Sequence, residues 1–151
     1  MRVIDGKPES SPPVSRNKHR AVPQIGDVMT PFPYAIDVER SAGDAERLLA
    51  GREIHHLPVT SAGDVYSVLS TRELELTLAR PGADPWRIGV RELCSKDPYI
   101  VELSEPLDVV LEQMAERKLS CAVVVKDDRV AGIFTHVDAC RVFVEWLRAE
   151  R

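Results

Sequence analysis

The stretch IHHLPVTSAGDVYSVLSTRE at residues 54–73 is followed later in the chain by a similar stretch, LSCAVVVKDDRVAGIFTHVD, at residues 119–138. Each contains two short runs rich in valine and other apolar residues, separated by a turn that contains Asp. This order is typical of a β-hairpin. Each stretch ends with a Ser or Thr three residues before an acidic residue, a spacing that marks the start of a helix. The two stretches therefore predict the same strand–strand–helix unit twice.

The repeat extends over most of the chain. The two halves align without gaps, and each matched residue lies 65 positions after its counterpart. Chemical character matches at pairs such as Ser70/Thr135 and Glu73/Asp138. Identical residues recur at Pro33/Pro98, Tyr34/Tyr99, Ala50/Ala115, Arg52/Arg117, Val59/Val124 and Val65/Val130. Two copies of one supersecondary unit are the economical explanation.

Each copy is predicted to run strand, helix, strand, strand, helix. An amphipathic helix follows the first strand, with Ser41 as its N-cap in one copy and Ser104 in the other. These helices are expected to end near Gly51 and Lys118. The other expected elements are strands at 34–38, 57–60, 65–69, 99–103, 122–125 and 130–134, and final helices from 71 to about 80 and from 136 to about 148.

The domain organisation follows from the turn-forming segments. Residues 1–24 lack sustained periodicity and are expected to form a flexible N-terminal tail. The run at 80–85, Arg-Pro-Gly-Ala-Asp-Pro, has the composition of a linker. We therefore expect a first repeat at 25–80, a linker at 81–87, and a second repeat with an extended C-terminal helix at 88–151. Two such units packed about a pseudo-twofold axis would form an α+β module with a ligand cleft between them.

Composition narrows the possible functions. The 151 residues carry a net charge of −4 without a basic stripe, which argues against nucleic-acid binding. No apolar run approaches the roughly 18 residues of a membrane span and no signal sequence is recognisable, so a cytoplasmic protein is expected. The three cysteines are expected to be buried, reduced thiols. The chain is too short for a large catalytic domain and shows no nucleophile–base motif, so we expect it not to be an enzyme.

Three segments together resemble the cystathionine-β-synthase-type (CBS) repeat. They are IGDVMT at 25–30 before a proline-led strand, IHHLPV at 54–59, and GIFTHVD at 132–138. The resemblance in order and spacing covers about residues 25–143. It implies a pair of β-α-β-β-α repeats, called a Bateman module, of a kind that often binds adenosine-containing ligands and commonly dimerises.

The segment from Gly132 to Asp138 supports a phosphate–ribose site on its own chemistry. Free backbone N–H groups at a helix start favour an anion, and the Thr135 hydroxyl adds a hydrogen bond. The Asp138 carboxylate accepts hydrogen bonds and therefore suits the two hydroxyls of a ribose. The same residues also fit a helix capping box, as do Ser70 and Glu73. Both roles stay open, because one can hold in the apo state and the other in the bound state.

The resemblance implies two sites, each built from both repeats. The first would combine Thr135, His136 and Asp138 with Tyr34, Ala35, Ile54 and His55. The reciprocal site would combine Ser70 and Glu73 with Tyr99, Ile100, Leu119 and Ser120. The second departs from the family pattern, since Glu73 replaces an aspartate, Ser67 a glycine and Ser70 a threonine. The longer glutamate would crowd the ribose, so the second site is expected to be weaker or empty.

The predicted function is therefore a non-catalytic regulatory module that binds AMP, ADP or ATP and signals to an unidentified protein. No cofactor is expected, and no metal site, because adjacent His55 and His56 point to opposite sides of an extended segment. The apolar face of the final helix, with Cys140, Phe143 and Val144, predicts a homodimer. The alternatives are a ligand-free dimerisation scaffold and a metal-binding or S-adenosylmethionine-binding module.

Overall fold

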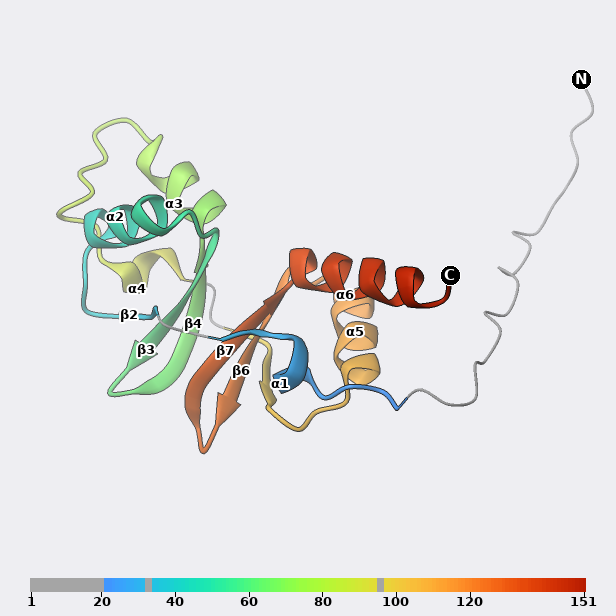
Figure 1. The fold of residues 1–151 in the computed structure, drawn as a ribbon. Helices are drawn as coiled ribbons and strands as arrows, with labels where there is room; N and C mark the ends of the chain where they lie inside the picture. Colours follow the sequence, from blue (N-terminus) through green and yellow to red (C-terminus); the bar gives the residue numbers. More distant parts are fainter. Residues whose placement is uncertain (1–20, 32–33, 95–96) are drawn as a thin grey trace, which may run out of the picture.

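The computed structural model describes residues 21–31, 34–94 and 97–151, and these form two lobes. In the first lobe the sheet order is β2-β3-β4, with β2 (Ile36–Asp37) parallel to β3 (His56–Ser61) and β3 antiparallel to β4 (Asp64–Ser70). Its helices are α2 (Ala42–Arg52), α3 (Thr71–Leu78) and the short α4 (Val90–Leu93). The strand–helix–strand–strand–helix order predicted for the first copy is present (Figure 1).

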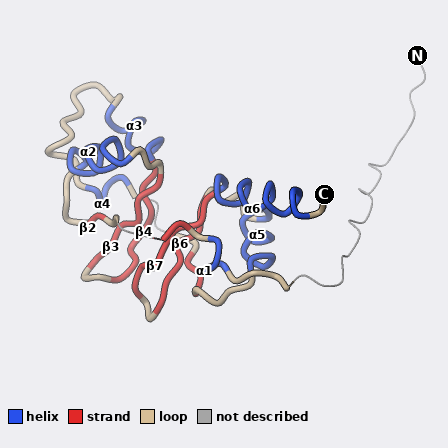
Figure 2. The backbone as a smooth tube through the Cα atoms, in the orientation of Figure 1, coloured by secondary structure: helices blue, strands red, loops and turns tan. Residues whose placement is uncertain are grey.

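The second lobe repeats this arrangement with one added strand. The sheet order is β1-β7-β6-β5, and the helices pack on it as in the first lobe. Figure 2 shows the strands of both lobes lying between the helices α2 and α3 at one end and α5 and α6 at the other. The elements of this lobe are α1 (Ile25–Val28), β1 (Thr30–Pro31), β5 (Ile100–Glu102), α5 (Leu107–Glu116), β6 (Cys121–Lys126), β7 (Arg129–Thr135) and α6 (His136–Ala149).

Backbone conformation is conserved between the two repeats more closely than residue identity is. Left-handed conformations occur at Glu53 and Lys118, each just after the end of α2 or α5. Ala62 and Gly63 in the first hairpin turn, and Asp127 and Asp128 in the second, also have positive φ. Every one of these pairs is separated by the predicted 65 residues. The duplication is therefore visible in the turns, where unusual φ values make the geometry specific.

The short helices α1 and α4 pack against the lobe of the other repeat. Ile25 of α1 is fully buried in the core of the second lobe, and Val90 of α4 in that of the first. Backbone bonds hold both helices in place: Ile25 N–H donates to the Glu105 carbonyl (2.8 Å), and Val90 N–H to the Arg40 carbonyl (2.8 Å). The two packed lobes are therefore not the two sequence repeats, because each repeat contributes its first helix to the other.

Two predictions about individual residues were wrong. Ser104 is not the N-cap of α5, because the helix begins only at Leu107. Pro106 occupies the N-cap position and makes no side-chain capping hydrogen bond. Cys140 is exposed on α6 rather than buried, while Cys94 and Cys121 are partly buried and all three thiols are free. Among the helices of the described ranges, none is long and apolar enough to cross a membrane.

Candidate functional site

A hollow of about 210 Å³ lies between the two lobes. It includes five of the six residues predicted for the reciprocal site; the sixth, Ile100, is not part of the lining and is 42% exposed. The first lobe lines it with His56, Ser67, Val68, Ser70 and Glu73, and the second with Asp97, Pro98, Tyr99, Lys118, Leu119, Ser120 and Cys121. Because both repeats contribute, any ligand held here would contact both lobes at once.

Glu73 stands at the start of α3 and forms the capping box that its spacing predicted. Its Oε2 accepts hydrogen bonds from the Ser70 N–H (2.8 Å) and the Ser70 hydroxyl (3.0 Å). The Ser70 Oγ in turn accepts from the Glu73 N–H (3.3 Å). Capping therefore engages one carboxylate oxygen, and Oε1 is the oxygen through which Glu73 could accept a hydrogen bond from a ligand.

His56 joins the lobes inside this hollow. Its Nε2 lies 3.3 Å from the Ser120 Oγ. Burial, followed by the charges of His55 and His136, lowers the pKa of His56 below its ordinary 6.5, although the Glu73 charge opposes this shift. The imidazole is therefore neutral at pH 7 and offers one donor and one acceptor nitrogen.

Sequence reasoning selected His55 and missed His56, Asp97, Lys118 and Cys121. The alternation of side chains along β3 was the signal for His56, because it pairs with Ser70 in the β3–β4 register. Lys118, which has a left-handed backbone conformation just after α5, also lines the hollow. No pattern in the sequence marked that position, since its counterpart in the first repeat is Glu53.

The two partly buried cysteines are poor nucleophiles. Burial raises the pKa of the Cys121 thiol to about 11, although a hydrogen bond with Ser120 acts in the opposite direction. Burial raises the pKa of Cys94 to about 11 as well, opposed by a hydrogen bond with Ser67. Both thiols are protonated at neutral pH, and nucleophilic chemistry needs the thiolate.

Asp138, the acid predicted to bind ribose, is enclosed at the start of α6. It is 3% exposed. Its Oδ1 accepts from the Thr30 hydroxyl (3.0 Å) and from Nη1 of Arg141 (3.0 Å). Its Oδ2 accepts from the N–H (2.9 Å) and the hydroxyl (3.1 Å) of Thr135. A ribose could reach this carboxylate only by replacing some of these four protein contacts.

The other residues predicted beside Asp138 lie in separate places. The Tyr34 ring is covered by the Arg52 guanidinium, 4.4 Å from its centroid. Ala35 lines a hollow of about 510 Å³ along α2, whereas Ile54 and His55 line one of about 470 Å³ between α2 and α3. His136 Nε2 lies 2.8 Å from the Leu119 carbonyl oxygen, so this nitrogen carries the proton. The Asp138 site therefore stays a prediction.

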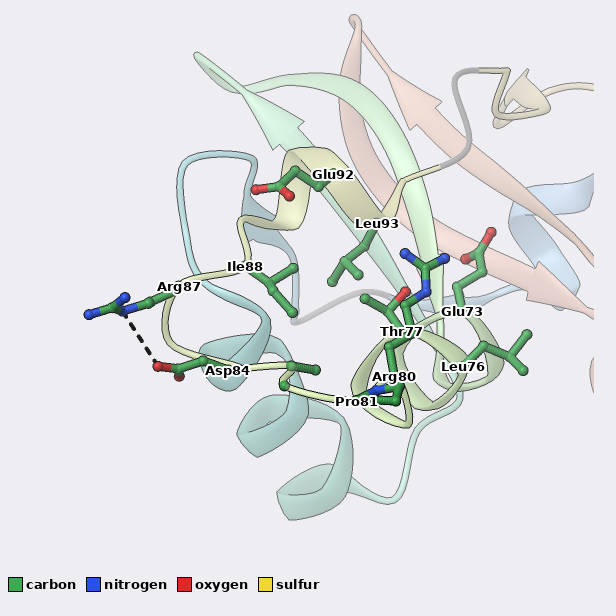
Figure 3. Close-up of a pocket in the computed structure, with 12 residues that line it drawn as sticks. Glu73, Leu76, Thr77, Arg80, Pro81, Asp84, Arg87, Ile88, Glu92 and Leu93 are labelled. Carbon is green, nitrogen blue, oxygen red and sulfur yellow. Dashed lines mark ion pairs between the residues drawn. The ribbon is translucent and has the colours of Figure 1, made fainter.

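A larger hollow adjoins the inter-lobe one. It measures about 630 Å³ and lies between α3, the segment 80–88 and α4 (Figure 3). Glu73 lines both hollows. Arg87 and Asp84 form an ion pair at its far side, 3.6 Å apart. Any ligand or side-chain movement that displaces Glu73 would therefore change the shape of both hollows.

The fold and the cleft together define a class of protein: a pair of β-α-β-β-α repeats with a hollow that both repeats line. The chain belongs to the CBS domain family, whose model matches residues 25–78 and again residues 90–145. The two matches confirm the resemblance in the sequence, and the α+β fold of two repeats is confirmed with them.

Similar structures agree in fold. The CBS domain pair of protein MJ0100, solved with 5′-methylthioadenosine and S-adenosyl-L-methionine, is 24% identical, with a TM-score of 0.73 over 83% of this chain and 98% of that one. The CBS domain of the bacterial CNNM/CorC family Mg²⁺ transporter, solved with ATP, is 23% identical, with a TM-score of 0.71 over 80% of this chain and 87% of that one. At these identities the likeness shows the fold alone.

One curated protein is also similar to the chain. A homoserine O-acetyltransferase of Methanocorpusculum labreanum is 28% identical over 113 residues, which cover 74% of this chain and 22% of that protein. The chain thus spans about a fifth of the length of this relative.

Proposed function

We propose that this CBS pair is a non-catalytic regulatory module that binds AMP, ADP or ATP between its lobes. The observation that carries the proposal is the hollow with Glu73 on one wall and Tyr99 and Lys118 on the other. A carboxylate, an aromatic ring and an ammonium group are what a ribose, a base and a phosphate respectively need. Two proteins of the same fold, solved with ATP and with adenosyl compounds, give independent support.

The proposed ligand sits on the Ser70 and Glu73 side of the module. The Glu73 Oε1 accepts from a ribose hydroxyl, and the base packs beside the Tyr99 ring, over which Arg117 already lies at 5.0 Å. Lys118 meets the phosphates at the rim. The hollow of about 210 Å³ is smaller than the roughly 300–1,000 Å³ of most ligand pockets, so the lobes move apart when a nucleotide binds.

This need for movement supplies the regulatory mechanism. A ligand shifts a conformational equilibrium only through different affinities for the two states. In the ligand-free, closed state, His56 and Ser120 are in contact across the two lobes. In the bound state, the ligand holds the lobes further apart. An unidentified protein in the same compartment, expected to be the cytoplasm, binds the two states differently and so responds to the ligand. We propose that the module acts as a homodimer.

The side of Thr135, His136 and Asp138 remains a second proposed site. Ligand binding there requires the Thr30 and Arg141 contacts of Asp138 to yield to a ribose. The full set of this proposal is Thr135, His136, Asp138, Tyr34, Ala35, Ile54 and His55. Because the Asp138 carboxylate is enclosed, we expect the side of Ser70 and Glu73 to bind the ligand more tightly.

A matched pair of filling variants tests which side binds. Ser120 and His55 are equivalent positions of the two repeats, and both are exposed. We expect Ser120→Trp to abolish the thermal stabilisation by ATP, and His55→Trp to leave it unchanged. A ligand at 100 times its dissociation constant stabilises the native state by about 2.7 kcal/mol, which a thermal-shift assay resolves.

A panel of ATP, ADP, AMP, adenosine and S-adenosylmethionine completes the experiment. Stabilisation by the last compound alone would favour the methyl-donor alternative, and stabilisation by none would favour a ligand-free scaffold. Loss of binding in the His55 variant alone would move the site to the Asp138 side. Zinc with and without chelator tests the metal alternative; the described residues contain no group of three metal-ligating side chains.

A further inference from the structure

The hollow between α3, α4 and the segment 80–88 is large enough for a small molecule. It measures about 630 Å³ (Figure 3). This lies within the roughly 300–1,000 Å³ of most small-molecule pockets, whereas the inter-lobe hollow is smaller. It is therefore a candidate ligand site distinct from the space between the lobes, although Glu73 lines both.

The segment 80–88, which forms one wall of this hollow, is anchored to α2. The Pro85 and Ile88 carbonyl oxygens accept hydrogen bonds from the first two backbone N–H groups of α2 (both 2.8 Å). The Trp86 ring lies so close to Gly43 that a Cβ atom on this glycine would be 2.6 Å from the ring. Because these contacts fix the segment, the wall of the hollow does not depend on a ligand for its shape.

Two guanidinium groups line this hollow, and they differ in their partners. The Arg87 side chain turns outward and forms an ion pair with Asp84 (3.6 Å). The Arg80 side chain points into the hollow (Figure 3), and to the described residues it makes neither a hydrogen bond nor an ion pair. A guanidinium offers a planar fork of N–H donors that matches a carboxylate. Arg80 is therefore available to an anionic group of a ligand.

A carboxylate and a hydroxyl lie on the same face of α3 as Arg80. Glu73, Thr77 and Arg80 follow one another at intervals of four and three residues, so all three line the hollow from one side. The capping hydrogen bonds of Glu73 engage Oε2 and leave Oε1 for a ligand. The apolar part of the lining comes from Leu76, which is 62% exposed, and from Leu93. The hollow thus offers an acceptor, a cation and an apolar surface together.

The second lobe has a different set of groups in the same place. The counterparts of Thr77 and Arg80 are Val142 and Glu145 on α6. Both line a groove of about 480 Å³ between α6, α5 and residues 21–23, and its lining is mostly apolar. The duplicated fold therefore does not itself require a guanidinium and a hydroxyl at these positions, and the polar set belongs to the first lobe.

We propose that this hollow binds a free α-amino acid with an apolar side chain. The α-carboxylate accepts hydrogen bonds from the Arg80 guanidinium and the Thr77 hydroxyl, and the α-ammonium group donates to Glu73 Oε1. The side chain of the ligand packs against the apolar lining. A phosphate would bring two negative charges beside Glu73, whereas a zwitterion matches the anion and the cation together. The inference does not depend on the nucleotide, although Glu73 Oε1 can serve only one of the two ligands at a time.

Isothermal titration of the whole chain without nucleotide tests the site, with L-leucine, L-methionine and L-phenylalanine as probes. We expect binding, and we expect Arg80→Gln to weaken it at least ~10-fold, because a charge-assisted hydrogen bond is lost. Arg87→Gln is the matched control: it makes the same change in the same hollow, but at a guanidinium that turns outward, and should leave the dissociation constant unchanged. Far-UV circular dichroism checks that both variants are folded.

Analogues that lack one charged group give a second measurement on the unmodified protein. For leucine these are 4-methylpentanoate, without the ammonium group, and 3-methylbutylamine, without the carboxylate. Each should bind at least ~10-fold more weakly than the amino acid. No binding of any probe at millimolar concentration, equal binding of an analogue, or equal losses in the two arginine variants would overturn the proposal.

A variant of the inter-lobe hollow separates this site from the proposed nucleotide site. Ser120→Trp fills the inter-lobe hollow and should leave amino-acid binding unchanged. Loss of amino-acid binding in this variant would place the probe between the lobes and overturn the inference. Nucleotide stabilisation is measured separately, so either proposal can fail alone.

Discussion

The two lobes have the same backbone arrangement but differ in the contacts and charges of their equivalent residues. At the start of α3, Glu73 faces an open hollow between the lobes, whereas Asp138 at the start of α6 is enclosed by Thr30 and Arg141. After the first helix of each repeat, Glu53 and Lys118 have the same left-handed backbone but opposite charges. A duplicated fold thus retains its turns and core while its binding surfaces diverge, so equivalent positions provide matched controls for each other.

The largest expected effect concerns the crossing helices α1 and α4. Ile25→Ala should destabilise the protein by about 3–4 kcal/mol, because it leaves a cavity in the core of the second lobe. Val90→Ala, the equivalent change in the first lobe, should cost less, since a smaller side chain is removed. Urea unfolding followed by circular dichroism measures both. A single transition in each variant shows that the lobes unfold together, and two transitions in Ile25→Ala would separate them.

The next effect contrasts the two acids. Asp138→Ala removes an enclosed carboxylate that accepts four hydrogen bonds, and should destabilise the fold by about 2–3 kcal/mol. Glu73→Ala loses one half of a partly exposed capping box and should cost only about 1 kcal/mol. Thermal unfolding without nucleotide compares them. Equal losses would contradict the idea that one acid is structural and the other is free for a ligand.

A third prediction uses the charge difference after the first helices. Lys118→Gln should weaken ATP binding about tenfold, which corresponds to about 1.4 kcal/mol, and leave adenosine binding unchanged. Glu53→Gln, its counterpart, should alter neither. Isothermal titration with both ligands gives the ratio for each variant. If adenosine binding falls as much as ATP binding, Lys118 does not meet the phosphates.

The smallest effect is a pH dependence at the contact between the lobes. Because burial lowers the pKa of His56 in the folded protein, protonation favours the unfolded chain. Its contribution to stability is complete above pH 6.5 and is lost as the pH falls below 6.5 toward the lower folded-state pKa. The free energy of unfolding should therefore fall less steeply with acid in His56→Gln than in the wild type. His55→Gln removes one of the charges that add to the lowering of the His56 pKa, so its slope should lie between those of the wild type and of His56→Gln.

Much of the fold followed from the sequence because periodicity and turn residues are local signals. The hairpins at 57–69 and 122–134 and the N-cap at Ser41 were placed to within a residue or two. The short helices α1 and α4 were missed as elements, since four residues give no period to detect. Their exchange between lobes depends on tertiary packing of Ile25 and Val90, which no local pattern encodes.

The site was less predictable than the fold. Five of the six residues of the reciprocal set, namely Ser70, Glu73, Tyr99, Leu119 and Ser120, line one hollow, whereas Ile100 does not. Their role in binding stays a prediction. The ranking of the two sides rested on the length of the acid, and it did not include the neighbours of Asp138. Thr30 lies 108 residues away in the sequence, so its hydrogen bond to Asp138 becomes visible only when the sheets are assembled.

Because α1 and α4 are exchanged, the segment that was duplicated in the sequence is not the unit that packs around one core. A fragment cut at the linker would keep the first sheet but lose Val90 and Leu93, and would leave Ile25 without the core that buries it. Excision of either half thus yields an incomplete interior and a stranded helix. Evolution could duplicate the segment freely, yet from then on neither half could be discarded alone, because each supplies a piece of the other's interior.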